Sequence, residues 1–272
     1  MASPSATTLS ESRLAPAWAG LRAEGRPALI PYLTAGFPTA SASEAALRAA
    51  DEVADILEVG VPFSDPLADG PTIQRSTFEA LRQGMTLPGT LELVARVRPR
   101  RPVVIFSYLN PILRYGVERF LRDADALGIA GLLLTDLPAG SDPAVEQAIQ
   151  ASPVDLIRLI APTTRPNRLA AAMAGAEGFV YLVARLGVTG ASSALAADLD
   201  ASVARVRQAT TLPIAVGFGI SSAEQAAAVA RLADGVVVGS ALVDRLAREG
   251  VAGARRFLVE LRAALERGAV PA

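Results

Sequence analysis

The chain has 272 residues, 51% of them hydrophobic and 19% charged, a composition that supplies a large apolar core and excludes general intrinsic disorder. Its 26 basic and 27 acidic residues give a net charge of -1, which excludes a broad electrostatic attraction to nucleic acid or to a membrane surface. Cys, His and Lys are absent and every basic residue is Arg, so thiolate, imidazole and lysine-imine chemistry are excluded, as are Cys and His metal ligands.

The first ten residues, 1–10, are small and polar and predict a flexible N-terminus ahead of a single domain over 11–272. They lack the basic and apolar parts of a signal peptide, and no apolar run reaches the roughly 18 residues that span a bilayer. We therefore expect a cytoplasmic protein. A helix is predicted from Pro16 to Ala23, because Pro stands at its start and Gly25 follows its end.

Eight short segments rich in Val, Ile and Leu recur along the chain, separated by longer stretches with helical periodicity. The predicted strands are Ala28–Thr34, Asp55–Val59, Val103–Tyr108, Gly131–Asp136, Asp155–Ala161, Phe179–Ala184, Pro213–Phe218 and Gly235–Gly239. The predicted helices between them include Ser43–Val53, Val117–Leu127, Ala144–Ala151, Ala201–Ala209 and Ser222–Leu232. This alternation predicts an α/β protein with a single (β/α)8 TIM barrel, whose bottom the additional N-terminal helix is expected to cover.

A doubly wound open sheet is the main structural alternative, because it uses the same alternation of strands and helices. Its usual glycine fingerprint is missing after the first predicted strand, where residues Pro31 to Gly36 lead into a proline turn. No low-complexity linker divides the chain into two parts. These two observations favour the barrel.

Glu58 is the first catalytic candidate, because it stands near the carboxyl end of an otherwise apolar predicted strand. Active sites of barrels are built at that end. A carboxylate in a dry barrel mouth has a raised pKa, which suits general acid and base catalysis. The alternative interpretation is a Glu at the end of a strand that simply reaches water.

The connection that follows, from Val61 to Gln74, carries three prolines and two further carboxylates. Asp69 stands two residues before Pro71, where it could cap the next helix or take part in catalysis, and the pattern does not separate these roles. Asp65 before Pro66 is best interpreted from the pattern alone as an ordinary turn residue.

Glycine-containing segments follow the last three predicted strands, at 187–190, 217–222 and 238–240. Glycine allows the backbone to approach a ligand closely, and amides at helix starts donate hydrogen bonds to a dianion. Barrels frequently bind phosphate after strands seven and eight, a position that matches Gly219, Gly239 and Ser240. Each segment could also be a plain turn, but together they predict a phosphate site.

Four aromatic residues at strand ends could form the wall of a flat apolar substrate: Tyr32, Tyr108, Tyr181 and Phe218. The alternative is that these rings belong to the core of the barrel. Taken together, the pattern predicts a phosphorylated substrate with an apolar body, flanked by two carboxylates.

Several motifs occur in one order through most of the chain. They are LEVGVPFSDPLADGPTIQ at 57–74, Tyr108 with Asn110-Pro111, Asp136-Leu137-Pro138, Tyr181 with Gly187-Val188-Thr189-Gly190, Gly217-Phe218-Gly219-Ile220-Ser221, and Gly239-Ser240. In these motifs the sequence closely resembles the α subunits of tryptophan synthase. The stretch from Pro62 to Gln74 is the most specific part, whereas the glycine segments alone fit many phosphate-binding barrels.

The resemblance implies a (β/α)8 carbon–carbon lyase that cleaves indole-3-glycerol phosphate to indole and glyceraldehyde 3-phosphate, with no metal and no organic cofactor. Glu58 matches the family's catalytic Glu, which moves protons at indole C3 and at the glycerol hydroxyl. Asp69 matches the Asp that is bonded to the indole N–H. The implied substrate-binding residues are Tyr32, Ile73, Tyr108, Tyr181, Thr189 and Phe218, with Thr189 in a closing loop, and the implied phosphate-binding residues are Gly190, Gly219, Gly239 and Ser240.

The resemblance also implies a protein partner, a β subunit that contains pyridoxal phosphate and receives the indole within an α₂β₂ heterotetramer. Pro62, Asp65 and Asn110 match positions at that interface, which replaces the turn interpretation of Asp65. Three alternatives stay open at this point: a subunit that mainly activates its partner, a stand-alone indole-3-glycerol phosphate lyase, and another phosphate-binding barrel such as a sugar-phosphate isomerase.

Overall fold

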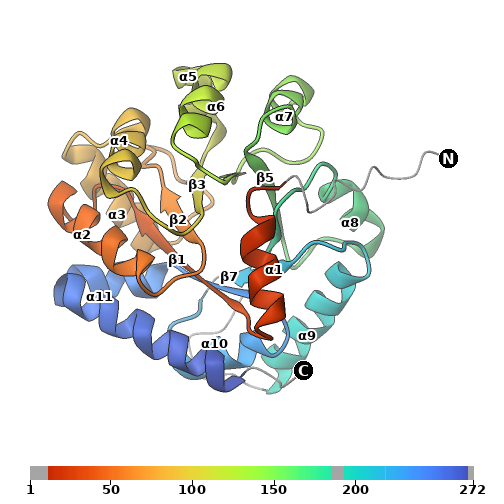
Figure 1. The fold of residues 1–272 in the computed structure, drawn as a ribbon. Helices are drawn as coiled ribbons and strands as arrows, with labels where there is room; N and C mark the ends of the chain where they lie inside the picture. The colour runs from red at the N-terminus through yellow and green to blue at the C-terminus, as the bar shows by residue number, and fades with distance from the viewer. Residues whose placement is uncertain (1–11, 185–192, 218, 269–272) are drawn as a thin grey trace.

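The computed structural model describes residues 12–184, 193–217 and 219–268, and eight strands in these ranges form one closed parallel barrel (Figure 1). The strands are β1 Ala28–Thr34, β2 Leu57–Gly60, β3 Val103–Ser107, β4 Gly131–Leu134, β5 Asp155–Ile160, β6 Val180–Val183, β7 Ile214–Gly217 and β8 Gly235–Val238. Each strand pairs with the next in sequence, and β8 pairs with β1 to close the barrel. The predicted (β/α)8 barrel is confirmed, and the open-sheet alternative is wrong. The expected flexible terminus, residues 1–10, lies outside the described residues.

One helix, α1 Ala15–Ala23, covers the amino end of the barrel, and the other helices surround the strands on the outer side (Figure 1). These other helices are α2 Ala40–Asp51, α3 Pro71–Arg82, α4 Leu87–Val97, α5 Leu109–Tyr115, α6 Val117–Ala126, α7 Pro143–Gln150, α8 Pro166–Ala172, α9 Ser193–Arg207, α10 Ala223–Ala230 and α11 Ser240–Gly268. A non-helical Gly250 divides α11 into two helical parts. Across the described ranges, none of the helices has both the length and the apolar character needed to cross a bilayer.

Alternate residues of each strand enter two different cores. In β2, Leu57 and Val59 join the large apolar cluster between the strands and the outer helices. Ile56, just before β2, joins the cluster inside the barrel together with Ile30 and Val104. Because side chains alternate along a strand, the residue between Leu57 and Val59 also points inward.

Helix α1 closes the amino end of the barrel, as expected. Its Trp18 is buried in the inner cluster, and the Trp18 ring lies 5.6 Å from the ring of Phe179. Leu14, which precedes α1, is fully buried and donates its backbone N–H to the carboxylate of Asp155 at the start of β5, at 3.1 Å. Helix α1 and the residue before it therefore cover the amino end of the barrel.

The prediction for β1 has the observed limits and that for β2 ends one residue early, whereas the predictions for β3 to β8 run one or two residues too far at their carboxyl ends. The prediction for β4 ran to Asp136, but the strand ends at Leu134 because the chain turns away there. The Asp136 carboxylate accepts the backbone N–H of Leu109 at 2.7 Å, which ties two of the carboxyl-end loops together. These residues lie beyond the ends of the strands, in the loops that form the candidate site.

Candidate active site

Glu58 lies in β2 and points into the barrel, between two residues that face the helices. The residue is 1% exposed, so the interpretation that Glu58 reaches water is wrong. Its Oε1 atom is buried and has no hydrogen-bond partner in the part of the chain that the structure describes. Burial raises the pKa of Glu58 to about 8, so the carboxyl is mostly protonated at neutral pH.

Asp69 lies in the connection between β2 and α3 and is held by Tyr108, the residue that follows β3. The Tyr108 hydroxyl donates to Asp69 Oδ2 at 3.0 Å and accepts the backbone N–H of Ala68 at 2.9 Å. Burial raises the pKa of Asp69 to about 6, and the hydrogen bond from Tyr108 opposes this rise. The two carboxyls therefore carry different protonation states between pH 6 and 8: Asp69 is largely ionised and Glu58 largely neutral.

The helix-capping alternative for Asp69 is wrong. Helix α3 begins at Pro71 after Gly70, and no side chain caps its first turn. The backbone of Asp69 is instead fixed by Gln74, whose side-chain amide donates to the Asp69 carbonyl at 2.9 Å. This leaves the Asp69 carboxylate free to face the barrel mouth, with Tyr108 as its hydrogen-bond donor.

Tyr32 in β1 and Tyr181 in β6 share the space around the two carboxyls. Both side chains are buried, and burial is the main reason that the pKa of each phenol is raised. The negative charges of Glu58 and Asp69 add to the rise at both tyrosines, so each carboxyl lies within electrostatic reach of both tyrosines. The Tyr32 hydroxyl also accepts a long hydrogen bond of 3.4 Å from Thr34 Oγ1.

Ile73 of α3 is buried, and its place in the pocket wall stays a prediction. The half-buried ring of Phe63 lies 5.1 Å from the ring of Tyr108, a contact that is not among the predicted ones. The signal was present, because Phe63 is an aromatic residue shortly after a strand that carries a catalytic candidate.

Three phosphate candidates lie in described parts of the chain. Gly239 follows β8, and its carbonyl accepts the N–H of Val243 at 3.0 Å as α11 begins. The amides of residues 240–242, at the start of α11, have no partner within the helix and are available to an anion. Gly219 has a positive φ of 81°, which favours glycine, and stands at the end of the neighbouring strand β7. Thr189, Gly190 and Phe218 lie outside the described residues.

The three interface candidates differ in exposure. Asp65 and Asn110 are exposed in loops or helices at the carboxyl ends of the strands, whereas Pro62 is buried. The Asp65 carbonyl accepts the N–H of Leu67 at 2.9 Å, so Asp65 is also part of a turn. Leu67 is 91% exposed, an unusual exposure for a large apolar side chain, and lies in the same loop.

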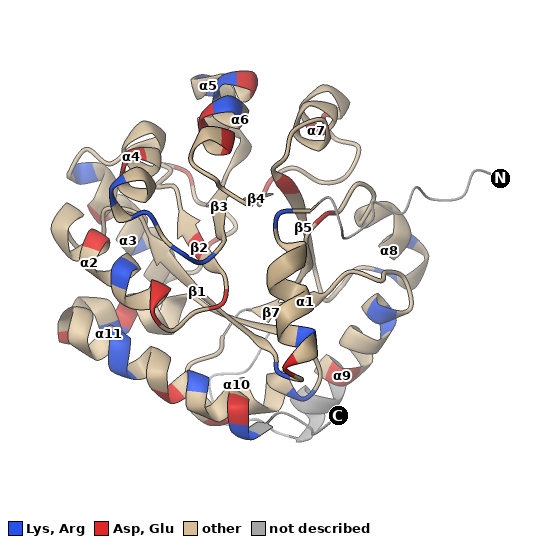
Figure 2. Cartoon of the chain, in the orientation of Figure 1, with Lys and Arg blue, Asp and Glu red and all other residues tan. Residues whose placement is uncertain are grey.

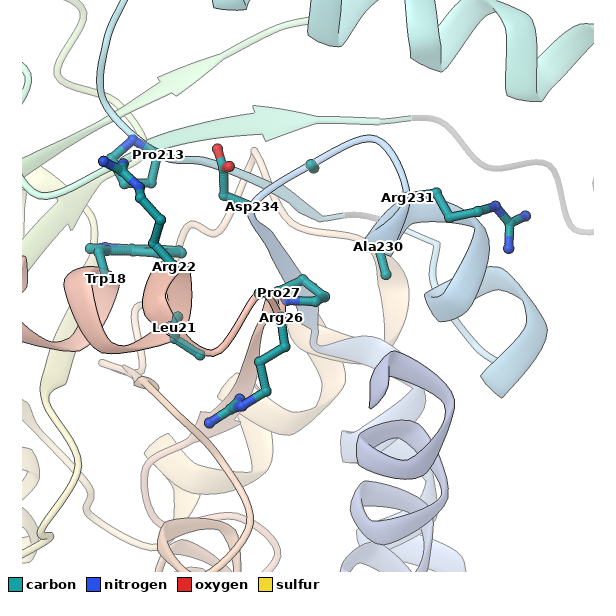
Figure 3. Close-up of a pocket in the computed structure, with 11 residues that line it drawn as sticks. Trp18, Leu21, Arg22, Arg26, Pro27, Pro213, Ala230, Arg231 and Asp234 are labelled. Atoms are coloured by element: carbon teal, nitrogen blue, oxygen red, sulfur yellow. The ribbon is translucent and has the colours of Figure 1, made fainter. Parts of the chain in front are cut away.

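A cavity of about 310 Å³ lies at the opposite end of the barrel, between α1 and the connection from α10 to β8 (Figure 3). Its polar groups do not converge: Figure 3 shows the Arg26 and Arg231 side chains pointing away from the cavity. The Asp234 carboxylate is already engaged by the N–H of Ile214 at 2.7 Å. This cavity is therefore a weaker candidate than the barrel mouth.

Charged residues elsewhere in the described ranges form no competing site. Arg, Asp and Glu are interspersed over the outer helices, with no large face of one sign in the view of Figure 2. Within the described residues no group of three or more Asp or Glu is arranged to hold a metal ion. The barrel mouth, with one buried neutral acid and one hydrogen-bonded carboxylate, is the candidate active site.

Comparisons with known proteins give one consistent result. A family model described as "Tryptophan synthase alpha chain" matches residues 18–267. A tryptophan synthase alpha chain of Chloroflexus aurantiacus is 47% identical over 264 residues, covering 94% of this chain and 99% of the relative. A tryptophan synthase structure from Mycobacterium tuberculosis has a TM-score of 0.86 at 44% identity, covering 93% of this chain and 98% of the other. The tryptophan synthase subunit alpha of Legionella pneumophila gives the same TM-score at 32% identity, covering 94% and 99%.

Proposed function

Because the chain belongs to the tryptophan synthase alpha chain family, we propose that it cleaves indole-3-glycerol phosphate to indole and glyceraldehyde 3-phosphate with Glu58 and Asp69 as its acid–base pair. The enzyme is a carbon–carbon lyase of the barrel class. The observation that supports the assignment of roles is the buried carboxyl of Glu58, whose Oε1 has no hydrogen-bond partner among the described residues, in a space where Tyr32 and Tyr181 feel the charges of both Glu58 and Asp69.

Glu58 supplies and removes the protons of the retro-aldol step. The neutral carboxyl gives its proton to indole C3, which makes the ring an electron acceptor. The bond between C3 and the first glycerol carbon then breaks, its electron pair restores the aromatic ring, and the glycerol hydroxyl becomes the aldehyde as its proton passes to the carboxylate. Each positioned proton transfer contributes about 10²- to 10⁴-fold, and orientation of the substrate supplies the remainder.

Asp69 acts on the nitrogen side of the ring. Protonation of C3 places positive charge on the indole nitrogen, and an ionised carboxylate bonded to the N–H stabilises that charge. The pKa of about 6 keeps Asp69 ionised at neutral pH, and Tyr108 fixes its orientation. The ring itself accepts the electrons, so the reaction requires neither a metal nor an organic cofactor.

The remaining site residues bind the two ends of the substrate. Tyr32, Ile73, Tyr108, Tyr181 and Phe218 bind the indole ring in this proposal, and Thr189 is assigned to substrate binding by its match to the family. Gly190, Gly219, Gly239 and Ser240 bind the phosphate, supported by the free amides at the start of α11 and by the position of Gly219 after β7.

The proposed partner is a tryptophan synthase β subunit in an α₂β₂ complex that receives the indole. Asp65 and Asn110 are exposed at the same end of the barrel as the site, and the projecting Leu67 adds apolar surface beside Asp65. Pro62 would then stiffen the loop from beneath, because it is buried. We place the enzyme in the cytoplasm, with residues 11–272 as one barrel domain.

Release of indole from indole-3-glycerol phosphate by the purified chain, with and without a β subunit, tests the function. We expect indole formation that rises when the β subunit is added. High activity alone with no response to the partner would favour a stand-alone lyase, whereas cleavage of simple sugar phosphates in place of the indole substrate would overturn the proposal.

The role of Glu58 is tested by Glu58→Gln, with Glu177→Gln as the matched control. Glu177 is also a partly buried carboxyl with a pKa raised by burial, to about 7, but its side chain accepts the N–H of Leu156 at the start of β5, far from the barrel mouth. Glu58→Gln should lose about 10²-fold or more in kcat while it retains ligand binding, whereas Glu177→Gln should keep near-normal turnover. Equal activity of the two variants would show that Glu58 takes no part in the proton transfers.

A further inference from the structure

The hydroxyl end of Tyr32 lies directly on the backbone of Gly60. Tyr32 belongs to β1 and Gly60 to the carboxyl end of β2, and the two strands pair with Tyr32 opposite Glu58 and Thr34 opposite Gly60. A Cβ atom at position 60 would lie 2.1 Å from Tyr32 Oη and 2.5 Å from Tyr32 Cζ. Contacts under 3.0 Å are essentially never made by real Cβ atoms, so the phenol occupies the space that any side chain of residue 60 would need.

The backbone of Gly60 is held on both sides and cannot move away. The Gly60 carbonyl accepts the N–H of Ala35, just beyond β1, at 2.9 Å. On the other side Gly60 is in register with Phe106 of β3, whose carbonyl accepts the N–H of Val61 at 2.9 Å. A side chain at position 60 would therefore displace Tyr32 and not the strand.

The Tyr32 ring is confined in most other directions. Phe106 packs edge-on against it, with 5.2 Å between ring centroids. A Cβ built on Gly239 of the proposed phosphate site would lie 3.5 to 3.7 Å from Tyr32 atoms, which is ordinary van der Waals contact. Thr34, which donates to the Tyr32 hydroxyl, is itself fixed by Ser76 of α3 at 2.7 Å. The open direction for a displaced ring is the barrel mouth.

We infer that Gly60 is a positioning residue, whose missing side chain lets Tyr32 lie on β2 and thereby sets the depth of the space available to the bicyclic ring of the substrate. This inference rests on the proposed function, since it concerns how the same site accepts an indole. Glycine is not required at position 60 by its backbone angles, because its φ is not in the left-handed region that glycine favours. The requirement is for space beside the Tyr32 hydroxyl.

The test compares Gly60→Ala, Tyr32→Leu and the double variant, with Gly20→Ala as the control. Leucine lacks the outer ring atoms that would clash with a Cβ at position 60, and a Cβ at Gly20 meets no atom within 4 Å. The measurements are the melting temperature, kcat and KM for indole-3-glycerol phosphate, and the inhibition constant of glycerol phosphate, which carries no ring.

We expect Gly60→Ala to raise KM about tenfold, to lower the melting temperature and to leave the inhibition constant of glycerol phosphate unchanged. A general loss of structure would weaken both ligands alike, so the difference between them isolates the ring pocket. Adding Tyr32→Leu to Gly60→Ala should raise the melting temperature back toward the wild-type value and reverse most of the increase in KM. Tyr32→Leu alone is expected to weaken binding of the ring.

An unchanged KM in Gly60→Ala, or a double variant no better than the single one in melting temperature and KM, would overturn the inference. Failure of the proposed function is seen separately, as a wild-type chain that does not cleave indole-3-glycerol phosphate. In that case the melting temperatures of the four variants still report on the contact between Tyr32 and Gly60. If Tyr32→Leu does not restore the melting temperature of Gly60→Ala, the inference is overturned independently of the proposed function.

Discussion

Two carboxyls in one barrel mouth have pKa values raised to different extents. In the proposed mechanism the more deeply buried Glu58, with a pKa of about 8, acts in its protonated form in the first step, whereas Asp69, with a pKa of about 6, acts as a carboxylate. We expect kcat/KM for indole-3-glycerol phosphate to follow a bell-shaped pH profile, with apparent pKa values near 6 and 8 that belong to the pair. A profile flat from pH 5 to 9 would show that neither titration limits the reaction.

Tyr108→Phe tests how Asp69 is kept ionised. The Tyr108 hydroxyl donates to the carboxylate and thereby lowers its pKa, so its removal should raise the pKa of Asp69 above about 6. The acidic limb of the pH profile should then move to higher pH and kcat/KM at pH 7 should fall about tenfold, the value of one lost hydrogen bond to a charged group. Activity should recover at pH 8 relative to pH 7. A uniform loss at every pH would indicate that Tyr108 acts only on substrate binding.

At the residue scale the sequence predicts the burial of Glu58 well and the environment of Asp69 poorly. A carboxylate within an apolar strand is a strong local signal, and its burial follows from the alternation of the strand. The hydrogen bond between Tyr108 and Asp69 joins residues 39 positions apart, so no local sequence pattern predicts it. The contact between Tyr32 and Gly60 is likewise set by the pairing of two strands, which the sequence predicts only as neighbours.

Helix α1 covers the amino end of the barrel, and its buried Trp18 side chain packs into the inner cluster. Trp18→Ala should lower the free energy of unfolding by about 3–5 kcal/mol, because it removes a large buried ring. KM for the indole substrate should stay unchanged, since the site lies at the other end of the barrel. Trp18→Phe should cost less, because it keeps an aromatic ring and removes an indole N–H that has no partner among the described residues.

Denaturant unfolding followed by circular dichroism, with KM measured on the same preparations, checks this prediction. A Trp18→Ala variant with wild-type stability would mean that α1 is only loosely attached. A large change in KM would mean that α1 and the catalytic end of the barrel are coupled through the inner core.

At the element scale, strands are predicted more closely than helices. The limits of β1 agree at both ends, because a run of buried apolar residues between turn signals has few alternatives. Helix α9 begins at Ser193, eight residues before the predicted Ala201. Helix α2 begins three residues early because the Thr39 side chain caps it by accepting the N–H of Ala42. Helix ends depend on such capping contacts, whereas strand limits follow from the apolar runs themselves.

The closed barrel brings carboxyls from distant parts of the chain into apolar surroundings, and this affects the stability of the whole molecule. Burial raises the pKa of Glu58 to about 8, of Glu177 to about 7 and of Asp69 to about 6. A raised folded-state pKa means that the native state binds the proton more tightly than the unfolded chain does. The stabilisation is fully present below the unfolded pKa of about 4 to 4.5 and is lost as pH rises through the folded values.

We therefore expect the free energy of unfolding to decrease from about pH 5 to pH 9, and Glu58→Gln to remove much of that decrease. The variant should match the wild type near pH 5, where Glu58 is neutral in the native state, and should be more stable by a few kcal/mol at pH 9, since each pKa unit corresponds to about 1.4 kcal/mol. Denaturant unfolding at pH 5, 7 and 9 measures this, with Glu260→Gln on the exposed face of α11 as a control that should follow the wild type. If Glu58→Gln also follows the wild type at all three pH values, Glu58 is not the buried neutral acid on which the catalytic step depends.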